Sequence, residues 1–384
     1  MRKEINITSG IKLFCVLAAG SFLLSACGKG EQKNEEISVT LTETDVTKPD
    51  LEYPFVTESE NGYYVWECIS QDWFWDRLIF MDKESGRVVP LCNRPDCGHE
   101  GAECNAYFPL MLSGADGIDK HYLQYYEGSL YAVGLSADDY ASIFRIKADG
   151  SEWEISTKLY RVNYASSGWR TPDLLIDDGY VYFVDSKQSH MKLERIPING
   201  KNAEIVFDVD GDWPVDIRWL KSNDGVIFFQ AIEFVDENWE NAIDRVYCYD
   251  PKVGQCRLVK ELTGPYSVQN GVVYYTNEGA LCRYSIEKQS TETIADCQMN
   301  VLNITLTKNF IILCDQMRDH SLTIFDYEGK KLATVQDTVR LDCYLGGNSD
   351  MLFGIWGDER GFGVCFLDLT RPLEELQWEK LAAD

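Results

Sequence analysis

The sequence predicts an all-β protein, a seven-bladed β-propeller built from four-stranded antiparallel blades. Two observations support this fold class. A hairpin pattern, in which a glycine turn precedes alternating aromatic and β-branched residues, recurs along the 384 residues, and a second hairpin follows each copy. Helical periodicity is scarce, with one clear candidate at residues 373–383. Because the last copies are degenerate, six or eight blades are the alternatives to seven.

The first hairpin of each repeat has the pattern of a tight turn between two half-buried strands. Its clear copies begin at Asn61-Gly62, Glu127-Gly128, Asp178-Gly179, Asp224-Gly225 and Asn270-Gly271. Degenerate copies follow at 309–313 and 350–353. The glycines are separated by 66, 51, 46 and 46 residues, so the long first interval predicts an insertion.

The second hairpin combines an apolar strand, a turn and a polar return strand. Its turns lie at Ser85-Gly86, Asp149-Gly150, Asn199-Gly200, Val253-Gly254, Lys288-Gln289-Ser290 and Glu328-Gly329. Two hairpins in a period of roughly 40 to 50 residues supply the four strands of one propeller blade. Radial stacking hides both faces of each sheet, whereas a β-sandwich has no reason to repeat one template seven times.

The two ends of the repeat region leave alternatives open. Residues 373–383 form either a helix or the outer strand of the last blade. Ring closure joins one end of the chain to the other, so we expect residues 37–41 or 53–56 to complete the final blade.

The insertion at residues 91–108 contains the densest chemistry of the chain. Three cysteines and a histidine, Cys92, Cys97, His99 and Cys104, fall within thirteen positions. Thiolate and imidazole are the ligands that tetrahedral zinc prefers, and a set of three Cys and one His would close its coordination shell, which predicts a structural zinc site. The spacing is not that of a common zinc knuckle, so a disulfide between two of these cysteines is the alternative.

The other cysteines predict little chemistry. Cys248 and Cys256 flank a turn, and we expect them to face each other across the hairpin. Cys282, Cys297, Cys314, Cys343 and Cys365 lie in apolar strands and are expected to be small buried hydrophobic residues.

The N-terminus predicts export. Residues 1–26 combine a basic start, an apolar stretch too short to span a bilayer and a small-residue cleavage site. Leu24-Ser25-Ala26-Cys27-Gly28 resembles the bacterial lipobox, which implies that Cys27 is diacylated and becomes the first residue of the mature protein. Residues 27–50 would form a flexible tether to a propeller domain at 51–384. The expected location is the extracytoplasmic face of the cell membrane.

The charge balance restricts the partners. With 36 Lys and Arg against 62 Asp and Glu, the net charge is −26, which argues against nucleic acid as a partner. Anionic lipid would repel such a body, so we expect the lipid on Cys27 to be the sole bond to the membrane.

Together these features resemble the β-propeller lipoproteins of Gram-positive bacteria, in particular those with low-density-lipoprotein-receptor-related-like propellers. The resemblance covers roughly residues 52–380 and rests on repeat style. It implies a toroid displayed outside the membrane.

We expect the propeller to bind or scaffold a glycan, peptide or protein partner without catalysis of its own. Asp72, Trp73, Trp75 and Asp76 are the candidate ligand-binding residues, because aromatic rings beside carboxylates in a loop suit stacking on sugars or capture of a peptide. No G-x-S-x-G motif occurs, and the remaining histidines have no Ser or Cys partner at a recognisable spacing. The alternative is a glycan- or peptide-processing enzyme with carboxylates in the central channel.

Overall fold

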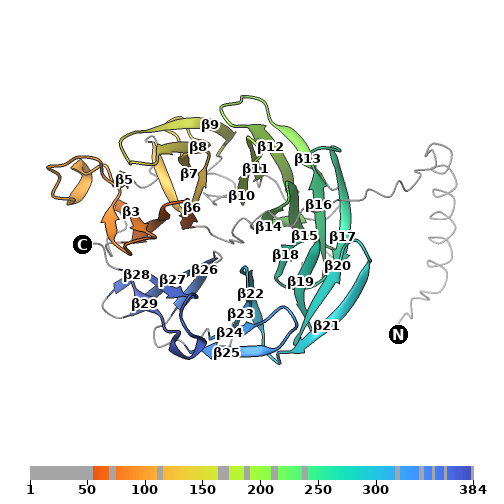
Figure 1. The fold of residues 1–384 in the computed structure, drawn as a ribbon. Coiled ribbons are helices and arrows are strands. Elements are labelled where there is room, and N and C mark those ends of the chain that lie inside the picture. The colour runs from red at the N-terminus through yellow and green to blue at the C-terminus, as the bar shows by residue number, and fades with distance from the viewer. Residues whose placement is uncertain are drawn as a thin grey trace, which may run out of the picture. The chain divides into compact units, whose positions relative to one another are not determined.

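The computed structural model describes residues 55–68, 75–109, 116–162, 173–185, 191–208, 215–235, 241–315, 321–336, 341–347, 351–358 and 361–381. Its strands form seven antiparallel sheets, in each of which consecutive strands pair with one another. The sheets are arranged around a central axis as the blades of a propeller, with the first strand of each blade innermost (Figure 1). The predicted seven-bladed fold is confirmed.

Each blade is a meander of four strands. Blade 1 consists of β1 (Val56–Glu58), β2 (Gly62–Cys68), β3 (Trp75–Asp82) and β4 (Val88–Pro90), with β5 (Tyr107–Pro109) also paired to β3. Blades 2 to 4 consist of β6 (Gly117–Tyr126), β7 (Ser129–Leu135), β8 (Tyr140–Lys147) and β9 (Trp153–Arg161); β10 (Leu174–Asp177), β11 (Tyr180–Asp185), β12 (Lys192–Pro197) and β13 (Glu204–Phe207); and β14 (Val215–Asn223), β15 (Val226–Phe234), β16 (Ala242–Asp250) and β17 (Gln255–Glu261). Blades 5 to 7 consist of β18 (Tyr266–Gln269), β19 (Val272–Asn277), β20 (Ala280–Ser285) and β21 (Ser290–Asp296); β22 (Val301–Leu306), β23 (Ile311–Asp315), β24 (Leu322–Phe325) and β25 (Lys331–Val335); and β26 (Leu341–Gly347), β27 (Met351–Asp358), β28 (Gly361–Asp368) and β29 (Glu379–Lys380). The two 3-10 turns are η1 (Gly101–Glu103) and η2 (Leu373–Glu375).

The glycine turns of the first hairpins follow the sequence prediction in four blades. Both residues of Glu127-Gly128, Asp178-Gly179, Asp224-Gly225 and Asn270-Gly271 have positive φ, as a type I′ hairpin turn requires. In blade 1 the turn was predicted one residue too late. Ser59 and Gly62 close it, and Gly62 already belongs to β2. Gly62 is needed there because a Cβ would lie 2.2 Å from the carbonyl oxygen of Met81 on β3.

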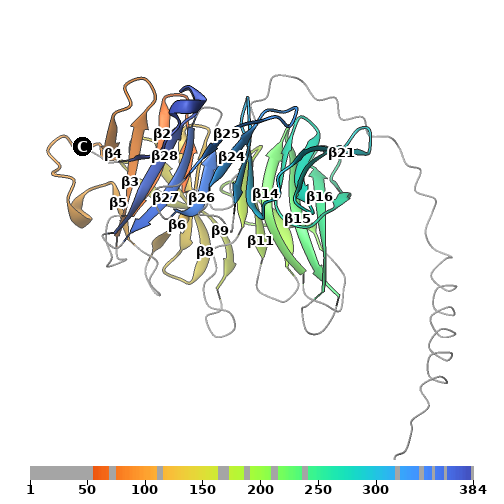
Figure 2. The same cartoon turned by 90° about the horizontal axis from the view of Figure 1, so that it is seen from below.

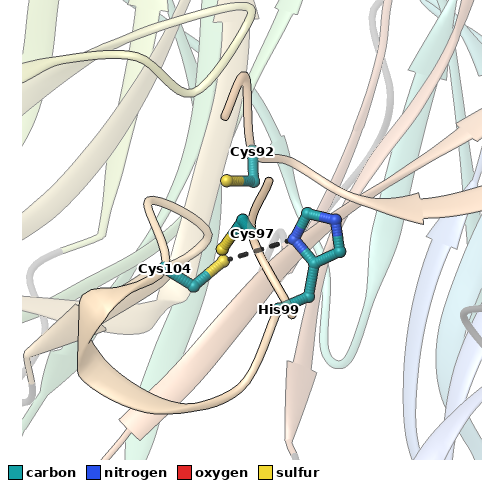
Figure 3. Close-up of side chains that lie close together, drawn as sticks. All are labelled: Cys92, Cys97, His99 and Cys104. Atoms are coloured by element: carbon teal, nitrogen blue, oxygen red, sulfur yellow. Dashed lines mark hydrogen bonds between the residues drawn. The ribbon is translucent and has the colours of Figure 1, made fainter. Parts of the chain in front are cut away.

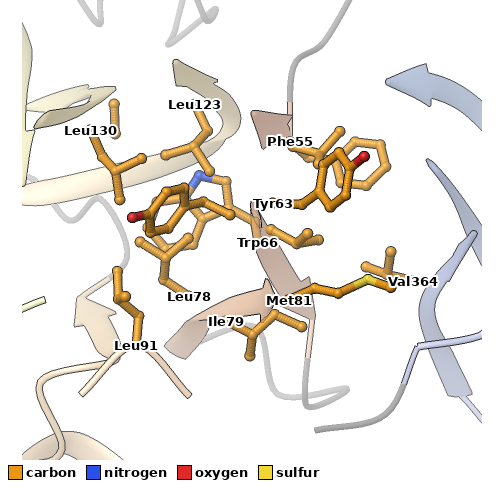
Figure 4. Packing of buried hydrophobic residues seen from close by; sticks show 14 of the residues in the cluster. Phe55, Tyr63, Trp66, Leu78, Ile79, Met81, Leu91, Leu123, Leu130 and Val364 are labelled. Atoms are coloured by element: carbon orange, nitrogen blue, oxygen red, sulfur yellow. The ribbon is translucent and has the colours of Figure 1, made fainter. Parts of the chain in front are cut away.

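Apolar side chains fill the seams between adjacent blades, so each sheet is buried by its neighbours. The cluster around Phe183 joins blades 2 and 3, and the cluster around Phe228 and Tyr266 joins blades 4 and 5. Val65 of blade 1 packs with Leu130 of blade 2 in a further cluster, which Figure 4 shows in part. Burial of apolar area at about 25 cal/mol per Å² is the dominant stabilising term of such a fold.

Polar side chains also join neighbouring inner strands. The bonds run from the N–H of Tyr125 to Thr57, between Gln124 and the backbone of Ile176, and from Ser222 to Asp177. Ser222 and Asp177 both lie near the C-terminal ends of their strands, as does Gln124. Adjacent blades therefore have the same orientation, with the inner strands parallel.

Side-chain packing between blades 7 and 1 closes the ring. The expectation that an N-terminal strand completes the final blade is therefore wrong. Of residues 53–56, Val56 begins β1, which belongs to blade 1, whereas residues 53, 54 and 37–41 lie outside the described part. Blade 7 is completed from the C-terminal side by the short β29 after η2, so 373–383 is not a helix. Leu381, whose N–H bonds to Val364, packs in the same cluster as residues of blade 1.

Among the described residues, no helix has the length and apolar character needed to cross a membrane.

Candidate metal centre and binding face

The insertion interrupts the outer strand of blade 1. β4 pairs with Ile79, Phe80 and Met81 in the second half of β3, and β5 pairs with the first half of β3. The intervening chain extends outward from the rim of the ring (Figure 1). The sheet is thus a four-stranded blade whose outer position is shared by two short strands, and the residues between them must be held together by other contacts.

Two apolar residues anchor the ends of this insertion at the seam between blades 1 and 2. Leu91 is buried, and its carbonyl oxygen lies close to Gly150 of the blade 2 outer hairpin. Phe108 packs its ring against Trp66 of blade 1, with ring centroids 5.3 Å apart, and against Trp153 of blade 2, at 6.1 Å. The insertion is therefore part of the blade 1–blade 2 packing.

The structure brings Cys92, Cys97, His99 and Cys104 together within this insertion (Figure 3). Their ligand atoms all lie within 4.8 Å of one another, and Sγ of Cys104 is 3.6 Å from Nδ1 of His99. A tetrahedral zinc ion with Zn–S of about 2.3 Å and Zn–N of about 2.05 Å would place sulfur and nitrogen about 3.6 Å apart. The four residues therefore fit a metal ion, and none of these cysteines is disulfide-bonded in the structure.

Backbone turns aim the four ligand atoms inward. His99 has a positive φ of 54°, and η1 then reverses the chain so that Cys104 returns toward it. The N–H of Cys97 bonds to the carbonyl of Arg94 in a second turn. The hydroxyl of Tyr107 donates to the carbonyl of His99 at 3.3 Å, which ties the ligand turn to β5.

Backbone N–H groups surround two of the sulfurs. Burial by itself would raise the pKa of Cys92, but hydrogen bonds from the N–H groups of Arg94 and Asn105 and from the thiols of Cys104 and Cys97 together outweigh it, so the pKa is lowered. The N–H of Ala106 donates to Sγ of Cys104 at 3.4 Å, yet burial raises the pKa of that thiol to about 12. A bound cation would stabilise the thiolate form of both residues, because its positive charge would offset the cost of burying a negative charge.

The candidate ligand-binding residues are placed only in part. Asp72 and Trp73 lie outside the described residues, and so does the predicted lipidation site Cys27. Trp75 and Asp76 begin β3, where their backbones pair with Pro109 and Phe108 of β5. The chain that follows the metal centre therefore lies directly beside these two residues.

The meander topology divides the strand ends between two faces of the ring. One face, here called the turn face, carries the first-to-second and third-to-fourth strand turns, such as Asp178-Gly179 and Asn199-Gly200. The other, here called the loop face, carries the second-to-third connections and the links between blades, including those after Cys68, Arg161, Phe207 and Phe234. Figure 2 shows the strands edge-on between these faces.

The expected pair of Cys248 and Cys256 does not form. Tyr249 is the residue opposite Cys256, and Cys248 is opposite Arg257, so the two side chains point to opposite sides of the sheet. A turn of four residues shifted the register by one position from the expectation. Cys282, Cys314 and Cys365 are buried as expected, while Cys297 is half-buried.

Sequence reasoning missed a set of four polar side chains on blade 4, toward the loop face. Arg218 and Gln230 are paired across β14 and β15, and Asp216 and Asp244 lie one row away. The residues come from three strands and carry no motif, so sequence alone offers only the Asp-x-Arg alternation of β14 as a signal.

Comparison with known proteins shows similarity at the level of the fold. No protein-family model and no curated protein match this sequence. A structure described as a prolyl endopeptidase matches 87% of this chain with a TM-score of 0.57 and 14% identity. A puromycin-hydrolysing peptidase of Mycobacterium tuberculosis matches 90% with a TM-score of 0.57 and 12% identity. The match to BamB of Moraxella catarrhalis covers 81% of this chain and 83% of the BamB chain, with a TM-score of 0.45 and 12% identity.

These matches overturn the expectation that the protein has no catalytic activity. This chain spans about half of the two peptidases, 50% and 55% of their lengths, and shares its fold with them. Because this fold occurs in enzymes, the absence of a recognisable motif is no ground for excluding catalysis. At 12–14% identity the likeness shows the fold alone and assigns no activity to this chain.

Proposed function

We propose that this protein is a lipid-anchored, extracytoplasmic β-propeller that binds a glycan, peptide or protein partner on its loop face. The observation that carries this proposal is the topology. The first-to-second strand turns of blades 2 to 5, on the turn face, are two residues long, whereas the longest link between blades, residues 162–173 between β9 and β10, is on the loop face. Scaffolds place recognition in such connections because they vary without disturbing the core.

The anchor in this proposal is the lipid on Cys27, followed by the tether at 27–50. The net charge of −26 supports attachment by lipid, because an acidic body gains nothing from an anionic membrane surface. Metabolic labelling with an alkyne fatty acid tests it. The intact protein should be labelled and sediment with membranes, and Cys27→Ser should lose both properties. Labelling that persists in Cys27→Ser would exclude this anchor.

The aromatic loop of blade 1 is the proposed centre of recognition, through Asp72, Trp73, Trp75 and Asp76. It leaves β2 after Cys68 and enters β3 at Trp75, so both of its ends are on the loop face. Stacking of an aromatic ring on a sugar or peptide side chain contributes about 0.5–1.5 kcal/mol beyond burial.

A screen of the purified protein against glycan and peptide arrays tests this site. Trp73→Ala should weaken binding of the best array compound at least tenfold. Trp378→Ala next to outer strand β29 is the matched control, because it removes a partly buried tryptophan that packs in the cluster of blades 6 and 7. Equal binding by Trp73→Ala and the unsubstituted protein would refute the assignment.

The metal centre is proposed to hold structural zinc through Cys92, Cys97, His99 and Cys104. Four protein ligands leave no open position for a substrate, which is the arrangement of structural zinc sites. When bound, the ion would crosslink the segment that follows β4 to the segment that precedes β5.

Glycan or peptide processing is the second candidate function. It is favoured by the fold shared with two peptidases over 87% and 90% of this chain. Incubation of the protein with the array compounds that bind, followed by mass spectrometry, should reveal cleaved products if this candidate is correct.

A further inference from the structure

The three cysteines of the candidate metal centre lie close enough to react with one another. The ligand atoms of Cys92, Cys97, His99 and Cys104 all lie within 4.8 Å of one another, and the thiol of Cys92 shares hydrogen bonds with the other two thiols. A disulfide places its two sulfurs about 2.05 Å apart. Each sulfur of a pair therefore has to move by less than about 1.5 Å to reach its partner.

Solvent reaches two of the three cysteines. Cys92 and Cys97 are partly exposed, whereas Cys104 is 2% exposed. The four residues between Cys92 and Cys97 are all exposed, so no buried side chain anchors the loop that joins them. A small oxidant dissolved in water therefore meets Cys92 and Cys97 before it meets Cys104.

The four ligands are divided between the two segments of the insertion. Cys92 and Cys97 lie on the segment that follows β4, whereas His99 and Cys104 lie on the segment that precedes β5. A bond between Cys92 and Cys97 would join two residues of the same segment. It would also leave two protein ligands, which is half of the closed shell that a structural zinc site needs.

The other bonds between the two segments are made by polar groups near the surface. Nδ2 of Asn105 donates to Oδ1 of Asn93 at 2.9 Å, and the guanidinium of Arg94 donates to the carbonyl of Glu103. Water competes for such groups, so each bond contributes little to stability. The segment that precedes β5 leads to Phe108, which packs between tryptophans of blades 1 and 2. Loss of the metal crosslink is therefore expected to loosen this segment.

We propose that the metal centre is a redox switch that hydrogen peroxide opens. The thiolate of Cys92 or Cys97 attacks one oxygen of the peroxide, the O–O bond breaks, and a sulfenic acid and a hydroxide ion form. The thiolate of the other cysteine attacks the oxidised sulfur, which forms the disulfide and releases a second hydroxide ion. Two thiolates thus give two electrons to one peroxide, and an added dithiol reverses the step by exchange. This inference rests on the proposed zinc site and names its regulation.

Zinc release and disulfide mapping test the proposal. The purified, reduced protein is loaded with zinc and treated with hydrogen peroxide while a chromogenic chelator reports free zinc. Cleavage before Asp96 and after Glu100 places the three cysteines on different peptides, so mass spectrometry identifies the oxidised pair. We expect one zinc ion released for each disulfide between Cys92 and Cys97, and zinc rebinding after reduction with dithiothreitol.

Hydrogen exchange measures whether the insertion opens. The backbone amides of residues 104–108 should exchange at least about tenfold faster after oxidation, and equally fast after chelation, because both treatments remove the same crosslink. Cys297→Ser is the matched control, since Cys297 is a partly exposed cysteine outside the insertion. This variant should release zinc at the same peroxide concentration as the unsubstituted protein.

The outcomes separate this inference from the proposed zinc site. Reduced protein that binds no zinc would overturn both. Bound zinc that peroxide does not release would overturn the switch and leave the zinc site standing. A disulfide that includes Cys104 would overturn the switch as well, because it would link the two segments covalently. Hydrogen exchange that is unchanged after zinc release would show that the crosslink does not hold the segment, which also contradicts the proposal.

Discussion

Gly150 of the blade 2 outer hairpin approaches the carbonyl oxygen of Leu91 so closely that a Cβ at Gly150 would lie 2.2 Å from it. Leu91 is the residue at which the Cys/His insertion leaves blade 1. The seam between the first two blades and the start of the candidate metal centre therefore share one contact, and a substitution in blade 2 is expected to disturb the centre.

Gly150→Ala should lower the free energy of unfolding more than Gly254→Ala does. Both glycines have positive φ, 71° and 70°, so each substitution costs about 1–2 kcal/mol of backbone strain. Gly254 has no atom within 4 Å of a Cβ, whereas Gly150 must displace Leu91, which adds about 1–3 kcal/mol. Urea unfolding of both variants measures the difference, and equal values would refute the contact.

Zinc should bind with one ion per chain and stabilise the fold. With free zinc a thousandfold above its dissociation constant, stabilisation would be about 4 kcal/mol. Cys97→Ser should lose the ion, and Cys297→Ser, a half-buried cysteine outside the insertion, should retain it. Elemental analysis with thermal unfolding before and after chelation measures both effects. If alkylation of the unreduced, denatured protein modifies just one of the three insertion cysteines, a disulfide holds the insertion instead.

Thr57→Val should destabilise the ring by about 1–3 kcal/mol, because it leaves a backbone donor without its acceptor. The N–H of Tyr125 on blade 2 donates to Oγ1 of Thr57 on blade 1 at 2.8 Å, and Thr57 is buried. Thr334→Val, at an exposed position of β25, is the control and should change stability by less than about 0.5 kcal/mol. Denaturant unfolding distinguishes the two variants. A Thr57→Val protein as stable as the control would show that this inter-blade bond contributes nothing.

Cys256 should react slowly with iodoacetamide in the native protein. Burial, together with the nearby Cys248, raises the pKa of the Cys256 thiol to about 12. A raised pKa means that the thiol stays protonated until the pH approaches that value, so its thiolate population at pH 8 is on the order of a thousandfold below that of a free cysteine. Mass spectrometry of labelled peptides, native against urea-unfolded, measures the ratio. The native rate should rise tenfold per pH unit, and a rate equal to that of the unfolded chain would contradict the assignment.

The repeat pattern was sufficient to predict the blades because a propeller is built from local contacts. A glycine turn and alternating apolar residues determine each hairpin, as at Asp178-Gly179, and consecutive hairpins then pair in order. Register was harder to predict. The turn at Gly62 and the pairing of Cys256 were each misplaced by one residue, and a shift of one residue turns a side chain to the other face of the sheet.

The candidate metal centre could be anticipated because its four ligands lie close together in the sequence. The polar side chains of Arg218, Gln230 and Asp244 on blade 4 could not be placed together from the sequence, because they meet through strand pairing, and no spacing along the chain reports on that pairing.

The sequence by itself determined the kind of repeat and the donor set of the insertion, since both depend on residues near one another along the chain. The number of blades, for which the sequence left six and eight open beside seven, was decided by the tertiary structure. Only the tertiary structure decided how the ring closes, that the outer strand of blade 1 is divided between β4 and β5, and which polar groups meet at the blade 4–blade 5 seam. These features are set by contacts between residues that are far apart in the sequence, and such contacts form only when the sheets pack against one another.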